Sequence, residues 1–304
     1  MRLGIFFGAA GRVLGGDELV DDVRAAAAAG FPSYWVPHLP WGPDALTSLA
    51  IAGREVPEIE LGTAVVPTWP RHPLALAQQA LTVTAIVGDR LSLGIGLAHA
   101  PVVEGMWGYR FERPVRHTRE YLEILGPALR NEKVSVRGEL FTGRSPAIAA
   151  SAPAPRVYVA ALGAQMLRLT GELADGTILW MTGPATIAEH TVPTLREAAE
   201  RAGRSAPRVI AGLPVLCTDE VDGGRALAAQ QFATYGTLPS YRAMLDREGL
   251  NGPEDMAVVG DESAVAARLE AFAAAGVDDV ICSEFGSSPE DFARTRACLA
   301  ALPR

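Results

Sequence analysis

Residues 3–36 read LGIFFGAAGRVLGGDELVDDVRAAAAAGFPSYWV, and this stretch contains one complete strand–helix unit. Its first five residues have the composition of a buried strand. Asp17 can then cap a helix whose apolar residues recur at helical spacing. Gly30 ends that helix, because glycine adopts the left-handed conformation of a helix end without strain. A second strand begins at Tyr34.

The same unit recurs along the chain, so we predict eight strands that alternate with helices. The strands are expected near 3–7, 34–36, 60–66, 91–95, 156–161, 177–180, 208–216 and 278–282. The helices after the first are expected near 44–55, 73–87, 115–130, 164–173, 185–202, 222–234, 262–275 and 289–301. Two segments depart from this alternation: a long loop over 98–114 and a hairpin over 134–141.

Strict alternation favours parallel strands joined by crossover helices. Eight units in about 300 residues fit a (β/α)8 TIM barrel with loop insertions at its C-terminal face. A doubly wound sheet is the rival, but residues 8–11 after the first strand read GAAG and lack the glycine fingerprint of that fold. A second G-x-G, at Gly94 and Gly96, has His99 where a third glycine would stand. No disordered linker divides the chain, so we expect a single domain over 1–304.

Composition narrows the class of protein. Hydrophobic residues make up 49% of the 304 residues, which is enough for a large core. The net charge of −8, with no dense run of Lys or Arg, argues against a nucleic acid or an anionic membrane as partner. The three cysteines have no C-x-x-C spacing, so we expect thiols rather than disulfides or a zinc site. We see no signal peptide and no apolar run that could span a bilayer, so a cytoplasmic protein is expected.

Two of the five histidines follow predicted strands, and barrel active sites form at the carboxyl ends of strands. His38 follows the second strand and His99 follows the fourth. The pKa of histidine suits proton transfer, so both are candidate catalytic residues, although many histidines are hydrogen-bonded structural residues. His, Asp and Glu show no metal-ligand spacing, so we predict no metal site. The G-x-S-x-G and P-loop motifs of hydrolases are absent as well.

Aromatic residues gather near the same strand ends, namely Trp41, Trp69, Trp107, Tyr109 and Trp180. They either cover the top of the barrel or form a pocket for a flat conjugated ring, such as a flavin or deazaflavin. The fifth strand runs through small residues into a helix, over Ala161, Leu162, Gly163 and Ala164. Small residues and free N–H groups at a helix start favour a bound phosphate.

Several segments keep a characteristic order and spacing: 61–66 (LGTAVV), 71–73 (RHP), 77–78 (AQ), 89–91 (DRL), 94–96 (GIG), 119–121 (REY), 159–165 (VAALGAQ) and 171–176 (GELADG). With these segments the sequence resembles the bacterial-luciferase-like superfamily of flavin- and F420-dependent barrels over nearly its whole length. The run 99–108 resembles an actinobacterial subgroup assigned to coenzyme F420.

The resemblance implies how coenzyme F420 would be bound. A non-proline cis peptide bond would lie at Ala64–Val65, behind the deazaflavin ring. His38 would lie beside the reactive edge of the ring, and Leu97 and His99 would lie near it. The backbone amides of Ala161, Leu162, Gly163 and Ala164 would bind the phosphate. Pro37 and His99 stand where related sugar-phosphate dehydrogenases carry an aspartate and a glutamate, so a sugar phosphate is not the expected substrate.

The function implied is hydride transfer between F420 and a small organic substrate, which is an alkene, an imine or a carbonyl/alcohol. His38 or His99 would donate or accept the proton, and Trp41, Trp69, Trp107 and Trp180 would line the substrate pocket. The alternative is a monooxygenase that uses reduced FMN and oxygen, since both cofactors share a tricyclic ring and a phosphate. A third reading is a flavin-binding protein without catalysis. Family members usually pair through the helices beside strands two and three, so a homodimer is expected.

Overall fold

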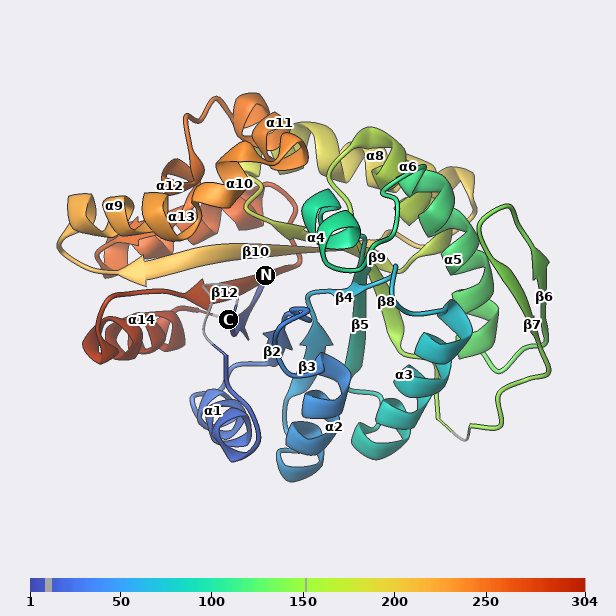
Figure 1. Cartoon of the computed structure of the whole chain (residues 1–304). Helices are drawn as coiled ribbons and strands as arrows, with labels where there is room; N and C mark the ends of the chain where they lie inside the picture. Colours follow the sequence, from blue (N-terminus) through green and yellow to red (C-terminus); the bar gives the residue numbers. More distant parts are fainter. Residues whose placement is uncertain (9–12, 151, 304) are drawn as a thin grey trace.

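Parallel strands close into a barrel (Figure 1) within residues 1–8, 13–150 and 152–303, which the computed structural model describes. Neighbouring strands pair in sequence order, and the last strand pairs with the first, so that Arg2 lies opposite Asp279. The eight barrel strands are β1 Arg2–Phe6, β2 Ser33–Val36, β3 Glu60–Thr63, β5 Leu91–Gly96, β8 Arg156–Ala160, β9 Gly176–Trp180, β10 Arg208–Cys217 and β12 Asp279–Glu284. The predicted (β/α)8 barrel is therefore confirmed, and closure of the sheet excludes the doubly wound alternative.

Helices surround the sheet (Figure 1), and the main ones lie near the positions that the sequence predicts. The main ones are α1 Asp17–Ala28, α2 Ala45–Glu55, α3 Pro73–Val87, α5 Pro114–Leu129, α6 Ala164–Leu173, α8 Val192–Arg201, α9 Val221–Gln231, α13 Glu262–Ala274 and α14 Pro289–Ala301. The cap predicted at Asp17 is wrong by one position. Gly16 occupies the cap, and Asp17 lies in the first turn, where its charge favours the helix dipole. Gly30 has φ of 80° and ends the unit as predicted.

Apolar side chains from the strands fill the barrel interior. The inner cluster consists of Phe6, Trp35, Tyr158, Ile178, Ile210 and Ile281. A larger cluster packs between the strands and the surrounding helices. The three cysteines are buried free thiols, as the sequence predicted. Among the described helices, none has the length and apolar character needed to cross a bilayer.

Charged residues close the amino-terminal end of the barrel. Arg208, Asp279, Glu60 and Arg2 each begin a barrel strand, so their side chains meet at the same end. Arg208 donates to both oxygens of Asp279, over 2.5 and 2.6 Å. It also lies 3.4 Å from Glu60, which accepts from Arg2 over 2.7 Å. Because active sites of this fold lie at the other end, we interpret this network as structural.

Four segments differ from the sequence prediction. The strand expected over 60–66 is split into β3 and a short β4, Val66–Pro67. The expected loop over 98–114 contains a short helix, α4 Ala100–Gly105. The hairpin consists of β6 Val134–Arg137 and β7 Thr142–Ser145, so 134–141 covers only its first strand and its turn. Within the helix expected over 185–202, α7 Pro184–Thr186 leads into a π-helical turn, η1 Ile187–Thr191, before α8.

An insertion between β10 and β12 was not predicted. It contains α10 Ala233–Thr237, α11 Pro239–Glu248, α12 Pro253–Met256 and β11 Val258–Gly260, which pairs with β10. Figure 1 shows α10 and α11 near α4, over one end of the barrel. Most of the loop over 8–11, in which the sequence showed no glycine fingerprint, lies outside the described residues.

Candidate active site

Small and aromatic residues form an apolar floor at the carboxyl end of the barrel. Ala64, Val65, Ala160 and Trp180 are half-buried and pack on the inner cluster. Gly96 at the end of β5 permits this arrangement, since a Cβ there would lie 2.5 Å from a Val65 methyl carbon and 3.1 Å from the Cβ of Ala160. The Ala64–Val65 peptide bond is cis, as the resemblance implied.

His38 lies two residues after β2, in the loop before α2, and the carbonyl oxygen of Val36 at the end of β2 accepts from the N–H of Ala64 in the floor over 2.8 Å. The backbone N–H of Ala45, the first residue of α2, donates to Nδ1 of His38 over 3.3 Å. Nδ1 is therefore an acceptor, and the neutral ring carries its proton on Nε2. Burial lowers the pKa of His38, and the Arg71 guanidinium lowers it further, against the opposing charge of Asp44. At neutral pH His38 is thus an uncharged ring with a donor at Nε2.

Asp44 connects His38 to the rest of the scaffold. It caps α2 by accepting from the N–H of Thr47 over 2.8 Å, and it accepts from Arg71 over 2.8 Å and from Gln79 over 3.2 Å. Its other contact is Nδ1 of His38, at 3.8 Å. Burial raises the pKa of Asp44, but these hydrogen bonds and the Arg71 charge outweigh burial and lower it. The carboxylate therefore stays ionised and fixes the loop that carries His38.

His99 lies at the end of β5, where the sequence placed it. It precedes α4, and its ring makes no cap hydrogen bond to that helix. Instead the ring meets the edges of two tyrosines of the insertion, with ring centroids 6.4 Å from Tyr235 and 5.8 Å from Tyr241. Burial lowers the pKa of His99. His99 is therefore a second neutral imidazole at the barrel mouth.

The proposed phosphate segment lies where β8 passes into α6. Gly163 occupies the cap of α6, and a Cβ added there would meet no atom within 4 Å, so the helix start faces open space. Nε2 of His190 donates to the carbonyl oxygen of Leu162 over 3.1 Å and thereby holds this segment. His190 lies in the π-helical turn η1. Sequence reasoning placed it inside a helix and did not predict its contact with Leu162.

The family model of luciferase-like monooxygenases matches residues 1–279. The chain belongs to this luciferase-like family. F420-dependent glucose-6-phosphate dehydrogenase of Nakamurella multipartita is 28% identical over 263 residues, which cover 82% of this chain and 76% of that protein.

Two solved structures show the same fold. F420-dependent tetrahydromethanopterin reductase of Methanopyrus kandleri matches with a TM-score of 0.83 and 21% identity, over 99% of this chain and 97% of that chain. The oxygenating constituent of 3,6-diketocamphane monooxygenase of Pseudomonas putida, in complex with FMN, matches with a TM-score of 0.80 and 18% identity, over 99% and 97% of the two chains. The luciferase-like fold therefore accompanies both cofactors among these neighbours.

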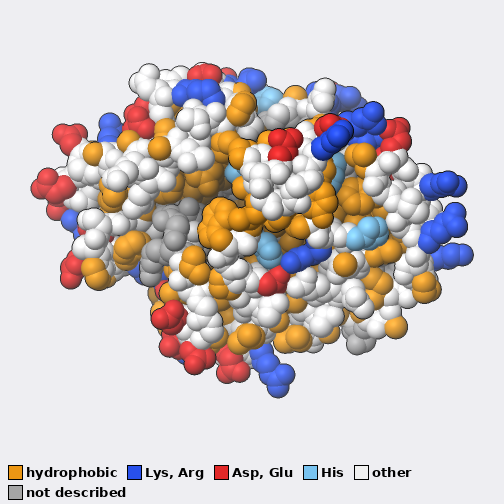
Figure 2. All heavy atoms as spheres, viewed as in Figure 1, with side chains coloured by type: hydrophobic (Ala, Val, Ile, Leu, Met, Phe, Trp, Pro, Cys, Tyr) orange, Lys and Arg blue, Asp and Glu red, His pale blue; other side chains and the backbone are white. Residues whose placement is uncertain are grey.

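Buried donors of this luciferase-like protein indicate that a ligand rich in acceptors fits the site. Nε1 of Trp69 and one Nη of Arg71 are buried without a hydrogen-bond partner in the described part of the chain, whereas Nε1 of Trp180 points to the hydroxyl of Tyr235. Arg71 pairs with Asp44 beside His38. Figure 2 shows pale blue histidines and one blue and red pair beside orange apolar side chains in the middle of this face. A flat ring with carbonyl and phosphate oxygens suits such surroundings.

The four candidate pocket tryptophans occupy different surroundings. Trp180 lies in the floor, with its ring centroid 5.4 Å from that of Phe6. Trp69 is half-buried and lies against His117, with ring centroids 4.0 Å apart and ring planes tilted by 32°. Trp107 is half-buried after α4, and Trp41 is 64% exposed. The ring of Tyr235 contacts both Trp180 and His99, so these two predicted site residues are linked in the structure. The pocket roles of Trp41, Trp69 and Trp107 remain predictions.

His117 is a structural histidine beneath Trp69. Its Nε2 lies 2.9 Å from Oγ1 of Thr68, and the residue is 2% exposed. Burial lowers the pKa of His117 to about 4. As the pH falls, the His117 ring therefore becomes protonated near pH 6.5 in the unfolded chain but only near pH 4 in the folded chain.

We expect this difference to make the protein less stable in acid. Between pH 6.5 and 4, His117 alone should lower the free energy of unfolding by up to about 3 kcal/mol. Urea unfolding of the wild type and of His117→Phe at a series of pH values measures this contribution. The variant should lose less stability over this window than the wild type. Parallel curves for wild type and His117→Phe would contradict the assignment.

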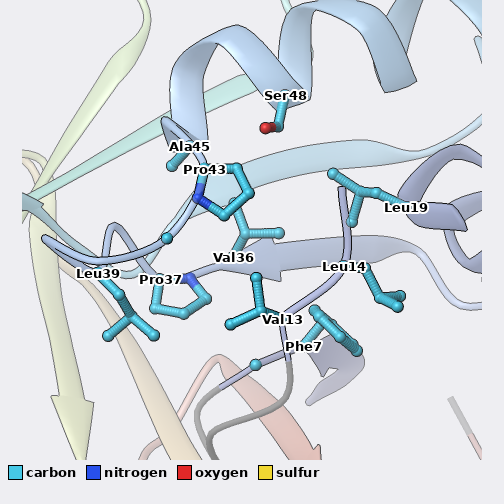
Figure 3. Close-up of a pocket in the computed structure, with 12 residues that line it drawn as sticks. Phe7, Val13, Leu14, Leu19, Val36, Pro37, Leu39, Pro43, Ala45 and Ser48 are labelled. Atoms are coloured by element: carbon cyan, nitrogen blue, oxygen red, sulfur yellow. The ribbon is translucent and has the colours of Figure 1, made fainter. Parts of the chain in front are cut away.

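A small apolar cavity lies beside the β2–α2 loop (Figure 3). Its wall includes Phe7, Leu19, Val36 and Pro37, and the last two immediately precede His38. The cavity volume is about 40 Å³, far below the several hundred Å³ of a cofactor pocket. We therefore place the candidate site over the floor and not in this cavity.

Proposed function

We propose that this luciferase-like protein is an oxidoreductase that transfers hydride between coenzyme F420 and a small organic substrate. The observation that carries the proposal is His38, an uncharged imidazole just after β2, the strand whose last residue, Val36, accepts from the N–H of Ala64 in the apolar floor. Within the described residues Nε2 of His38 makes no hydrogen bond, so this donor is available to a ligand. The name of the Nakamurella multipartita relative supports F420 as the cofactor. The substrate would be an alkene, an imine or a carbonyl/alcohol.

In this proposal each part of F420 has its own residues. Ala64 and Val65 would support one face of the ring, and Leu97 and His99 would lie along it. The backbone amides of 161–164 would hold the phosphate at the open start of α6. When bound, F420 supplies the carbon that gives or takes the hydride.

His38 and His99 would handle the proton that accompanies the hydride. Both rings are neutral at pH 7, because burial lowers both pKa values. A neutral imidazole can donate a hydrogen bond to a substrate oxygen or accept a proton from an alcohol. Alcohol oxidation requires the neutral form, so that activity would be retained above pH 6.5 and lost as the pH falls through the lowered pKa.

Cofactor choice is tested by parallel fluorescence titrations with F420 and FMN. We expect a dissociation constant for F420 in the micromolar range or below, and at least about tenfold weaker binding of FMN. Gly96→Ala should weaken F420 binding by about tenfold or more, because the added Cβ displaces Val65. Gly105→Ala is the matched control, since a Cβ at Gly105 meets nothing within 4 Å. Tighter binding of FMN, with oxygen uptake by the reduced complex, would instead support the monooxygenase. Tight cofactor binding with no turnover would support the non-catalytic reading.

We also propose a homodimer that forms through α2 and α3. A groove between these helices is lined by uncharged side chains: Thr47, Ala50, Ala75, Gln78, Gln79, Thr82, Val83 and Ile86. Ile51 and Ile86 are 52% and 45% exposed, although both are large and apolar. Sedimentation equilibrium should give a mass near twice 32.1 kDa for the wild type and a mass near 32.1 kDa for Ile86→Glu. A monomeric wild type would refute the proposal.

A further inference from the structure

The insertion between β10 and β12 contributes aromatic side chains to the barrel mouth. Tyr235 lies in α10 and Tyr241 in α11, and their ring centroids are 4.9 Å apart. Tyr235 also meets Trp180 of the floor, at 5.9 Å, and Tyr241 meets His99. A continuous aromatic wall, defined here as Trp180, Tyr235, Tyr241 and His99, therefore rises from the floor to the end of β5.

Polar atoms of this wall are free to bind a ligand. Tyr235, Tyr241 and His99 are half-buried, so each keeps part of its surface open. In the part of the chain that the structure describes, the Tyr241 hydroxyl and the His99 ring nitrogens make no hydrogen bond to protein, and neither group is among the buried atoms without a partner, so water reaches both. Two adjacent polar groups that water reaches, beside a half-open apolar surface, can exchange that water for the hydrogen bonds of a ligand.

The wall is electrically neutral. Burial raises the pKa values of Tyr235 and Tyr241, and burial lowers that of His99. The phenols therefore stay protonated and the imidazole stays uncharged at pH 7. The nearest ion pair described above, Arg71 with Asp44, belongs to the His38 side of the floor. A phosphate or carboxylate against this wall would lose its hydration without gaining an opposite charge.

We infer that the aromatic wall is the substrate-recognition surface and that it selects an uncharged carbonyl or alcohol compound with an apolar body. The oxygen of the substrate would accept from the hydroxyl of Tyr241, with His99 beside it, while the apolar body packs on Tyr235 and Trp180. Tyr241 is then a specificity-determining residue. This inference rests on the proposed function only for the reaction that follows substrate binding, and the binding itself does not depend on it.

Saturation-transfer NMR with two matched probes tests the inference on the full chain, with and without F420. The probes are cyclohexanone and 3-oxocyclohexane carboxylate, which differ by one negative charge. Cyclohexanone should bind, and the carboxylate should bind at least about tenfold more weakly. Tyr241→Phe keeps the ring contacts and removes one hydroxyl, so it should weaken cyclohexanone binding by about tenfold. Ser240→Ala, which removes an exposed hydroxyl of the same helix, should not change binding.

A charge swap provides an independent readout. Tyr241→Arg should reverse the preference and favour the carboxylate probe, because the wall then carries a cation. Equal binding of both probes, no binding of cyclohexanone, or an unchanged preference in Tyr241→Arg would each overturn the inference. The protein could bind cyclohexanone in a Tyr241-dependent way and yet fail to bind F420. That result would support the aromatic wall as the recognition surface and refute F420 as the cofactor. The two proposals therefore fail separately.

Discussion

Turnover should fall by roughly a hundredfold or more when His38 is replaced by alanine, whereas F420 binding should change by less than about threefold. The variant loses the donor at Nε2 that would accompany hydride transfer. It leaves intact the floor and the 161–164 segment, which would hold most of the cofactor. Asp44 keeps its three other donors, so the loop after β2 should retain its position.

Steady-state turnover with the best substrate of the wild type, together with an F420 titration, separates the two possible roles of His38. His72→Ala is the control, because His72 is also a loop histidine before a helix but is exposed and bonds to Leu74 and Thr142. An equal loss of turnover in both variants would remove His38 from the mechanism. A collapse of F420 affinity in His38→Ala would make it a binding residue.

Replacing Arg208 with methionine should lower the free energy of unfolding by about 3–5 kcal/mol. The reason is Asp279, whose side chain is 2% exposed and loses both of its hydrogen bonds from Arg208. Arg2 remains 3.4 Å from Asp279 but donates no hydrogen bond to it, so the buried carboxylate loses both of its hydrogen-bonded donors, which costs more than the loss of the ion pair itself. Urea unfolding followed by circular dichroism measures the loss.

Arg294→Met is the matched control for Arg208→Met. Arg294 also makes bidentate bonds to two carboxylates, Asp219 and Glu262, but does so at the surface, so its loss should be much smaller. A double variant, Arg208→Met with Asp279→Leu, should recover part of the loss, because the stranded carboxylate is removed. Equal losses for Arg208→Met and Arg294→Met would contradict the structural role of the network.

The barrel could be predicted from sequence because each strand is a short apolar run and each helix has its own start and stop signals. His38 and His99 could be predicted for the same reason, since both stand directly after a strand. The apolar pattern did not predict the break between β3 and β4, because apolar residues run through it without interruption, although the resemblance placed a cis peptide bond at this point, Ala64–Val65. The pairing there changes from Leu91 and Ser92 to Ile95 and Gly96, which only the folded sheet reveals.

The insertion was missed because its helices are short and mostly exposed. α10 has no buried residue, so it carries no apolar periodicity. Tyr235 and Tyr241 therefore lie far from any strand end that would have marked them as site residues. His190 was missed for a related reason, since its contact with Leu162 joins two segments 28 residues apart.

The pairing of β1 with β12, which closes the barrel, also affects folding during synthesis. On the ribosome β1 emerges before the other barrel strands, yet the residue opposite Arg2 is Asp279, so one edge of β1 stays unpaired until β12 has been synthesised. An unpaired strand edge is a template for aggregation. Nascent chains should therefore need protection by chaperones until β12 is released, and fragments that end before β12 should be poor expression products. Slow translation or low growth temperature favours the intact barrel, because fewer open-edged chains are then present together.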